Sequence, residues 1–262
     1  MSDYTTICEK AVRSGGATVL DWIGRIEARE KGPADLVTEA DFASQEVVRK
    51  IIADVFPDHS LLGEEEDQGA PFSETETEYR WILDPLDGTT NFVHRVPHFS
   101  VSLALERHGE LLVGAVYDPT RDECFSAAAG QGAYLNGQPI RTSQVFEMSE
   151  ALAAVGFPAG KCRNSPDLAV FLEAVDVCQA IRRTGSSALN LCYVAAGRFD
   201  VYWGFSTKIW DVAAGTLIVR EAGGTVTSPD GGPFVLDDAS FLAAANQRLH
   251  GQLRELVARA LP

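Results

Sequence analysis

The chain lacks any apolar run near the roughly 20 residues that a membrane-spanning helix needs. Its five cysteines form no CxxC motif, and their number is odd, so the cysteine pattern does not indicate a disulfide framework. The N-terminal sequence has no basic region followed by an apolar stretch, which a secretory signal would have. We therefore expect a cytoplasmic protein with reduced thiols and no membrane attachment.

Basic residues are scarce relative to acidic ones, at 22 Lys and Arg against 37 Asp and Glu, so the formal net charge is −15. A surface of this sign repels phosphate backbones, which argues against direct nucleic-acid binding. Most of the excess fits an ordinary acidic surface, and a smaller part is expected at a cation site. The 45% hydrophobic content suits one large domain or two tightly packed halves.

The first half of the chain has the pattern of helices followed by an antiparallel sheet. Helical apolar spacing predicts one helix over about residues 3–29 and a second after Thr38, which has capping-box spacing with Asp41. Asn136-Gly137 is typical of a hairpin turn. Strands are predicted near residues 81–83, 99–106, 111–117, 123–128 and 132–135.

From about residue 145 onward, strands alternate with helices, which favours a layered α/β arrangement. Because no repeat or flexible linker is evident, we predict an N-terminal half (1–144) and a C-terminal half (145–262) packed as one unit. The predicted elements of the second half are strands near 151–156, 180–183, 199–203 and 241–245, and helices near 167–178, from Ser186, from Asp211 and at the C-terminal end.

The strongest chemical signal is the segment DPLDGTT, residues 84–90, which follows a short apolar run. Its proline stiffens the turn and brings Asp87 back beside Asp84, and two neighbouring carboxylates repel unless a cation neutralises them. Oxygen ligands favour a hard cation such as Mg²⁺. The amides of Gly88 and Thr89, at a turn or helix start, are suited to hold a phosphate.

Each acidic residue also has an ordinary structural interpretation. The DPxDG pattern alone occurs in Asx-type turns that bind no ligand. Glu64 follows an apolar pair, but it belongs to a glutamate run that is equally typical of a solvated loop. Asp41 and Asp211 stand near the starts of predicted helices, where an aspartate can serve as the N-cap.

Taken together, DPLDGTTNF, the upstream GEE and LVTEAD, and the downstream WDVAAG resemble the motifs of the inositol monophosphatase family. The resemblance covers nearly the whole chain, from Lys31 to about Asn246, and this combination of motifs is highly specific. It implies a five-layer αβαβα sandwich of the α/β class, usually dimeric, with the active site between the two halves.

By motif position, the resemblance implies two or three Mg²⁺ ions held by Glu64, Asp84, the carbonyl of Leu86, Asp87 and Asp211. Asp84 would bridge two ions, and a third, weaker ion would lie near Glu64. Thr89, paired with Asp41, would orient and help deprotonate the attacking water. The phosphate would rest on the metals and on the amides of Gly88 and Thr89. Glu64 would also take part in catalysis, and Asp211 would also contact the substrate.

The segment RRTGSSA matches the family segment that lines the leaving-group pocket, so Arg182, Gly185, Ser186 and Ser187 are expected to contact the substrate. The alternative is a strand-to-helix turn with a serine cap. Inositol-cleaving members carry a glutamate seven residues before the last aspartate, and here that position is Gly204. This departure points away from inositol itself. Histidinol phosphate, fructose 1,6-bisphosphate and phosphorylated nucleotides are alternative substrates.

We therefore predict Mg²⁺-dependent hydrolysis of the phosphate monoester of a small metabolite by a lithium-sensitive homodimer. Paired metals stabilise both oxygens of an in-line displacement, so no histidine or cysteine nucleophile is needed. The alternative of another class is a regulatory, protein-binding role with little catalysis, since some bacterial members are thought to contact transcription machinery. The complete acidic motifs favour catalysis.

Overall fold

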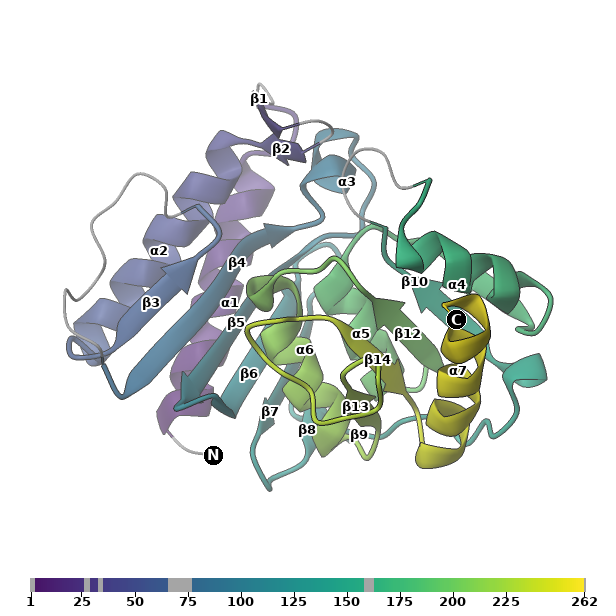
Figure 1. The fold of residues 1–262 in the computed structure, drawn as a ribbon. Helices are drawn as coiled ribbons and strands as arrows, with labels where there is room; N and C mark the ends of the chain where they lie inside the picture. The colour runs from purple at the N-terminus through teal and green to yellow at the C-terminus, as the bar shows by residue number, and fades with distance from the viewer. Residues whose placement is uncertain (1–2, 26–28, 33–34, 66–76, 158–162, 262) are drawn as a thin grey trace.

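The computed structural model describes residues 3–25, 29–32, 35–65, 77–157 and 163–261. Within this part of the chain, the strands form a seven-stranded sheet, a five-stranded sheet and a two-stranded ribbon. Helices cover the outer face of each large sheet and fill the space between the sheets, which gives layers in the order αβαβα (Figure 1). The predicted layered α/β class is therefore confirmed.

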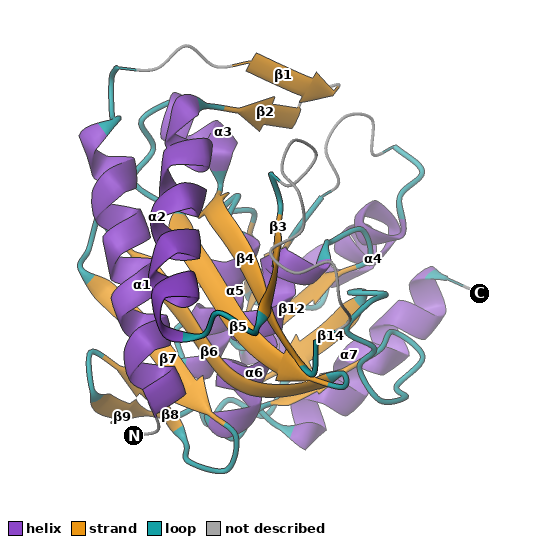
Figure 2. Cartoon of the chain, turned by 90° about the vertical axis from the view of Figure 1, so that its left-hand side faces the viewer, coloured by secondary structure: helices purple, strands orange, loops and turns teal. Residues whose placement is uncertain are grey.

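The first layer is a pair of helices, α1 (Asp3–Asp21) and α2 (Glu39–Val55), which lie side by side across one face of the large sheet (Figure 2). Their buried side chains recur every three or four residues, as at Val48 and Ile52, so each helix turns an apolar stripe to the sheet. The predicted first helix was too long. It ends in a tight turn before Gly24, whose left-handed φ of 75° an α-helix cannot continue.

The ribbon of β1 (Arg29–Gly32) and β2 (Asp35–Val37) follows α1 and leads to α2. Of the predicted helical span, residues 26–28 lie outside the described part, and Arg29 already belongs to β1. Sequence periodicity did not indicate these strands, because each is only three or four residues long.

The predicted capping box at the start of α2 is confirmed. The Thr38 hydroxyl accepts a hydrogen bond from the Ala40 N–H at 3.1 Å, and the Asp41 carboxylate accepts from the Thr38 N–H at 2.8 Å and the Thr38 hydroxyl at 2.7 Å. These bonds satisfy backbone donors that have no partner within the helix. They also hold the fully buried Asp41 carboxylate in one orientation.

The large sheet has the strand order β3-β4-β5-β6-β7-β8-β9, and its neighbouring strands are antiparallel except for β3 and β4. The predicted strands are confirmed, although β4 is longer than predicted and includes both Asp84 and Asp87. At the β8–β9 hairpin, Asn136 and Gly137 have φ values of 48° and 76°, as a type I′ turn requires. The strands are β3 (Ser60–Gly63), β4 (Tyr79–Asp87), β5 (Ser100–Arg107), β6 (Glu110–Asp118), β7 (Glu123–Ala128), β8 (Ala133–Leu135) and β9 (Gln138–Ile140).

The middle layer consists of α5 (Ser187–Ala195) and α6 (Ile209–Glu221). Residues 212–219 of α6 are all buried, because a sheet lies on each side of the helix. Small residues permit this packing: a Cβ built on Gly114 of β6 would lie 2.9 Å from the Cα of Ala214. The close approach sets the first turn of α6 against the end of β4.

The second sheet has the order β11-β10-β12-β14-β13. β10 pairs in parallel with β11 and β12, as strand–helix alternation predicts, whereas β14 is antiparallel to both of its neighbours. Helices α4 (Pro166–Val175) and α7 (Gln247–Ala260) cover its outer face (Figure 1). The strands are β10 (Leu152–Val155), β11 (Ala180–Arg182), β12 (Val201–Gly204), β13 (Thr225–Thr227) and β14 (Phe241–Ala244).

Three buried clusters lie between the successive layers, and the middle cluster joins residues of both sheets to α5 and α6. The adjacent β12 residues Tyr202 and Trp203 point to opposite faces of the sheet and belong to different clusters. The division of the chain at residue 144 stays a prediction. Among the described helices, none is long and apolar enough to cross a bilayer. Cys162 lies outside the described residues, and the other cysteines are free thiols.

Candidate active site

Strand β4 delivers two aspartates to one edge of the large sheet. Its pairing with β5 is interrupted between Asp84 and Asp87, and the Leu86 N–H turns back to donate to Asp84 Oδ1 at 3.0 Å. Gly88 then starts the short helix α3 (Thr89–Val93) with a φ of 94°. A Cβ on Gly88 would lie 3.2 Å from the carbonyl oxygens of Gly185 and His98, so the turn needs glycine for both conformation and space.

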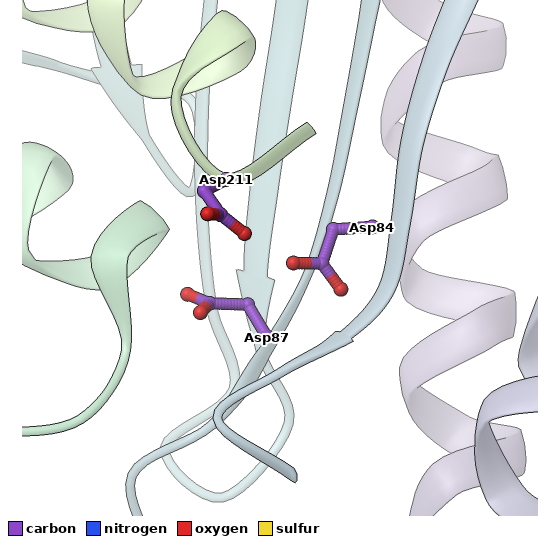
Figure 3. A group of neighbouring side chains, drawn as sticks. All are labelled: Asp84, Asp87 and Asp211. Atoms are coloured by element: carbon purple, nitrogen blue, oxygen red, sulfur yellow. The ribbon is translucent and has the colours of Figure 1, made fainter. Parts of the chain in front are cut away.

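A third carboxylate reaches the same place from the middle layer. Asp211 is the third residue of α6, and one of its oxygens accepts the Lys208 N–H at 2.8 Å. It therefore helps to satisfy the start of the helix, although Lys208 and not Asp211 occupies the N-cap position. One oxygen from each of Asp84, Asp87 and Asp211 lies within 4.8 Å of the others, and the three side chains gather in one place (Figure 3).

The electrostatics of this trio favour a bound cation. Burial, followed by the charges of Glu64, Asp87 and Asp211, raises the pKa of Asp84 well above its usual range. Burial, and then the charge of Asp87, raises the pKa of Asp211 to about 8. Without a counter-charge the three carboxylates resist simultaneous ionisation at neutral pH. A donor set made only of carboxylate oxygens fits a hard divalent cation.

Asp87 is held by the start of α5. The Ser186 hydroxyl donates to Asp87 Oδ2 at 2.5 Å, and the amides of Ser187 and Ala188 donate to the same carboxylate at 3.1 and 2.8 Å. Burial raises the pKa of Asp87, while these donors lower it. Ser186 also caps α5, because its hydroxyl accepts the Leu189 N–H at 3.2 Å. The hydroxyl of Ser186, predicted to contact substrate, is thus directed at an acidic residue of the cluster.

Thr89 and Asp41 meet beside the trio. The Thr89 hydroxyl lies 3.0 Å from the Leu86 carbonyl oxygen and 3.3 Å from Asp41 Oδ1, so it can donate to either acceptor. Burial raises the pKa of Asp41 to about 7, against the lowering effect of its bonds to Thr38. The structure therefore brings together a hydroxyl and a carboxyl group that takes up a proton near neutral pH.

Glu64 lies at the edge of this group. Its N–H donates to the Leu83 carbonyl oxygen at 3.2 Å, which fixes the backbone beside β4. The Glu64 side chain is outside the set of oxygens within 4.8 Å, but its charge contributes to the raised pKa of Asp84. Glu64 and Asp211 both line the large cavity described next.

A cavity of about 450 Å³ opens beside the carboxylates. A smaller cavity of about 90 Å³ is lined in part by Gly185, Ser186 and Arg183. Arg182, which was expected to contact substrate, is exposed on β11 and is absent from the described lining of both cavities. The large cavity is lined by Glu64, Gly156, Phe157, Asp167, Ser187, Gly204, Ser206, Thr207, Lys208, Trp210 and Asp211.

Asn91 is a site residue that the sequence did not indicate. Its side-chain amide donates to the carbonyl oxygens of His98 at 2.7 Å and Thr184 at 2.9 Å, which ties α3 to the loop before α5. An asparagine one turn after an acidic motif carries no pattern that distinguishes this role from surface exposure. Its importance depends on Thr184, which is 93 residues away.

Comparison with known proteins agrees with this geometry. The sequence profile of the inositol monophosphatase family matches residues 2–261 of this chain. The chain belongs to the inositol monophosphatase family. This membership supports a phosphatase activity and agrees with the carboxylates gathered at the cavity.

Relatives of this family member carry two kinds of name. It is 38% identical to an inositol-1-monophosphatase of Rhizobium meliloti, with 100% of this chain and 98% of that protein covered. It is 40% identical to the Nus factor SuhB of Pasteurella multocida, with coverage of 94% and 92%. The solved inositol monophosphatase of Anabaena superposes with a TM-score of 0.87 at 37% identity, covering 98% of this chain and 95% of that one.

Proposed function

We propose that this protein hydrolyses the phosphate monoester of a small metabolite with the help of Mg²⁺. The observation that supports this best is the convergence of Asp84, Asp87 and Asp211, from two layers of the fold, beside a cavity of about 450 Å³. Two buried aspartates and a partly buried third, all of like charge, are unfavourable unless a cation is bound between them. Family membership supplies the reaction class.

The proposed metal ligands are oxygen donors from β4, α6 and the end of β3. They would hold two or three ions through Glu64, Asp84, the Leu86 carbonyl, Asp87 and Asp211. When bound, Mg²⁺ stabilises charge on the phosphoryl oxygens and lowers the pKa of the attacking water. Oxygen-only ligands favour Mg²⁺ over softer metals.

The chain's own groups orient the phosphate and move a proton. The first turn of α3 leaves N–H groups without intrahelical partners, so the amides of Gly88 and Thr89 are proposed to bind phosphate oxygens. The Thr89 hydroxyl accepts a hydrogen bond from the attacking water. As the water oxygen bonds to phosphorus, its proton passes through Thr89 to Asp41. The bond from phosphorus to the leaving oxygen breaks, and that oxygen takes a proton from solvent.

Two details support the proposed proton transfer. The Thr89 hydroxyl lies within 3.3 Å of Asp41 Oδ1, and the other oxygen of Asp41 is occupied by Thr38. Burial raises the pKa of Asp41 to about 7, and a proton acceptor works best with a pKa near the working pH.

An activity screen tests the proposal. Purified protein with Mg²⁺ is assayed for phosphate release from inositol 1-phosphate, histidinol phosphate, fructose 1,6-bisphosphate, 3′-phosphoadenosine 5′-phosphate and glycerol 2-phosphate. We expect turnover of at least one ester, and loss of turnover in Asp84→Asn. Asp118→Asn is the matched control, because Asp118 is also buried in the large sheet but binds Thr120 and Arg121 away from the cavity. Turnover that survives in Asp84→Asn would remove the proposal.

A second candidate function is regulatory binding to a protein. It is favoured by the identity of 40% to a relative named as a Nus factor. Such a role does not require the acidic trio, so Asp84→Asn should retain partner binding while losing phosphatase activity. Affinity capture from the native cell with both forms of the protein, followed by mass spectrometry, separates the two functions. Light scattering on the same samples tests the expected homodimer.

A further inference from the structure

The large cavity has a carboxylate on its wall that the proposed reaction does not use. Asp167 is the second residue of α4 and is 1% exposed. Its Oδ1 accepts the Phe205 N–H at 3.0 Å, which joins α4 to the loop after β12. Its Oδ2 is shielded from solvent and has no hydrogen-bond partner among the described residues.

Leaving this carboxylate oxygen without a hydrogen-bond partner lowers the stability of the folded protein. A buried charged acceptor without a donor loses its hydration and gains no compensating bond. Burial accordingly raises the pKa of Asp167, despite the bond from Phe205. Most buried polar atoms in folded proteins have a partner, so this oxygen calls for a donor that enters the cavity from outside the chain.

One part of the neighbouring wall has no side chain. Gly204 lines the same cavity at the end of β12. A Cβ at this position would lie 2.9 Å from Thr207 Cγ2 and 3.0 Å from the Phe241 ring, so the backbone packs tightly where a longer side chain would have to start. Asp167 lines the same cavity from α4, which belongs to the layer outside the second sheet, whereas Gly204 lies on β12 of that sheet.

The rest of the lining indicates the charge of the donor. Phe157 and Trp210 present aromatic surface, and Glu64 and Asp211 add carboxylates, against the single lysine Lys208 among the described lining residues. Aromatic faces together with a carboxylate form a favourable environment for an ammonium group. A protonated amine also forms the stronger, charge-assisted hydrogen bond to a carboxylate.

We propose that Asp167 binds a protonated amine of the leaving group, so that the preferred substrates are phosphate esters of amino alcohols. This inference rests on the proposed phosphatase function and names the substrate class of the same site. Asp167 acts here as a specificity residue, while the metals and Thr89 perform the reaction.

Asp167→Asn is the informative variant, because its amide oxygen can still accept the Phe205 N–H while the charge is lost. Histidinol phosphate serves as the amine-bearing ester and glycerol 2-phosphate as the neutral one. We expect wild-type protein to prefer histidinol phosphate. The variant should raise KM for histidinol phosphate about 10-fold or more with little change in kcat. Its KM for glycerol 2-phosphate should be unchanged.

Asp176→Asn is the control, since it makes the same change of charge at an exposed position on the end of α4. Equal losses on both esters in Asp167→Asn, or a wild-type enzyme that does not prefer the amine, would overturn the inference. If the protein hydrolyses no phosphate ester, the proposed function fails separately. Calorimetric binding of histidinol to wild-type protein and its loss in Asp167→Asn would then decide the role of Asp167.

Discussion

The Ser186 hydroxyl lies 2.5 Å from Asp87 Oδ2, although the two residues are 99 positions apart in the chain. Ser186 is the N-cap residue of α5 in the middle layer, and Asp87 is the last residue of β4 in the large sheet. A hydrogen bond from a fixed donor orients a carboxylate for a metal ion and lowers the cost of its charge. The acidic cluster is thus held by hydrogen bonds between segments that are far apart in the chain.

Loss of the Ser186 hydroxyl should weaken metal binding. In Ser186→Ala we expect the Mg²⁺ concentration for half-maximal activity to rise about 10-fold, the scale of lost groups that orient metal ligands. The helix cap is lost as well, so stability should fall by ~1 kcal/mol. Asn246→Ala is the control, because Asn246 caps α7 on the outer layer, away from the site. Both variants should melt at lower temperature, but a shift in the Mg²⁺ requirement confined to Ser186→Ala is the expected result.

The Thr89 hydroxyl should matter for the rate more than for binding. Thr89→Val keeps the side-chain shape but cannot donate to Asp41, so kcat should fall about 100-fold or more with little change in KM. Thr89→Ser retains a hydroxyl and should retain most of kcat. Steady-state assays at saturating Mg²⁺ measure both effects. A valine variant with wild-type kcat would contradict the proposed proton transfer.

Stability without metal should fall as pH rises. The pKa values of Asp84, Asp87 and Asp211 are all raised in the folded protein, that of Asp211 to about 8. An acid with a higher pKa when folded favours folding in its protonated form. Its contribution is complete below the unfolded pKa of roughly 4 and is lost as pH rises through the folded value.

We therefore expect the melting temperature of chelator-treated protein to fall between about pH 5 and about pH 8, and Mg²⁺ to raise it more at the higher pH. Thermal denaturation followed by circular dichroism, with and without Mg²⁺, measures this. Asp211→Asn should flatten the pH dependence. A Mg²⁺ effect of the same size at both pH values would be inconsistent with carboxylates that must ionise to bind it.

Lithium should inhibit the enzyme by occupying a Mg²⁺ position among the carboxylates, as the family resemblance implies. Phosphate release is measured at increasing LiCl, with NaCl at matched concentration as the ionic-strength control. Inhibition by LiCl alone is expected. Unchanged rates at millimolar LiCl would exclude this behaviour for the protein.

The backbone at Gly204 should not accept a side chain without rearrangement. In Gly204→Ala, overpacking against Thr207 and Phe241 should lower stability by ~1–3 kcal/mol. Thr207→Ser removes the contacting methyl group but keeps the hydroxyl that donates to the Ala239 carbonyl, so the double variant should regain part of the loss. Gly251→Ala on α7 has open space around the new Cβ and should be neutral or stabilising. Chemical denaturation of the wild type, Gly204→Ala, the double variant and Gly251→Ala measures these stabilities. Equal stabilities of Gly204→Ala and the wild type would refute the prediction.

Features set by short sequence patterns were predicted well. The capping box of Thr38 and Asp41, the turn at Asn136-Gly137 and the strand before Asp84 depend on neighbours within a few residues. Their geometry follows from local hydrogen bonding and backbone conformation. The acidic motifs also named the trio correctly as neighbours, because together they resemble one family.

The remaining features depend on how distant elements pack. That Ser186 binds Asp87, that Asn91 joins Thr184, and that Asp167 lines the cavity follow from contacts across layers, which no local pattern encodes. The local residues specify where each helix and strand begins, whereas burial of both sheets against α5 and α6 selects which side chains meet. The aspartates were visible in the primary structure, but the groups that orient them and the cavity beside them came from the assembled fold.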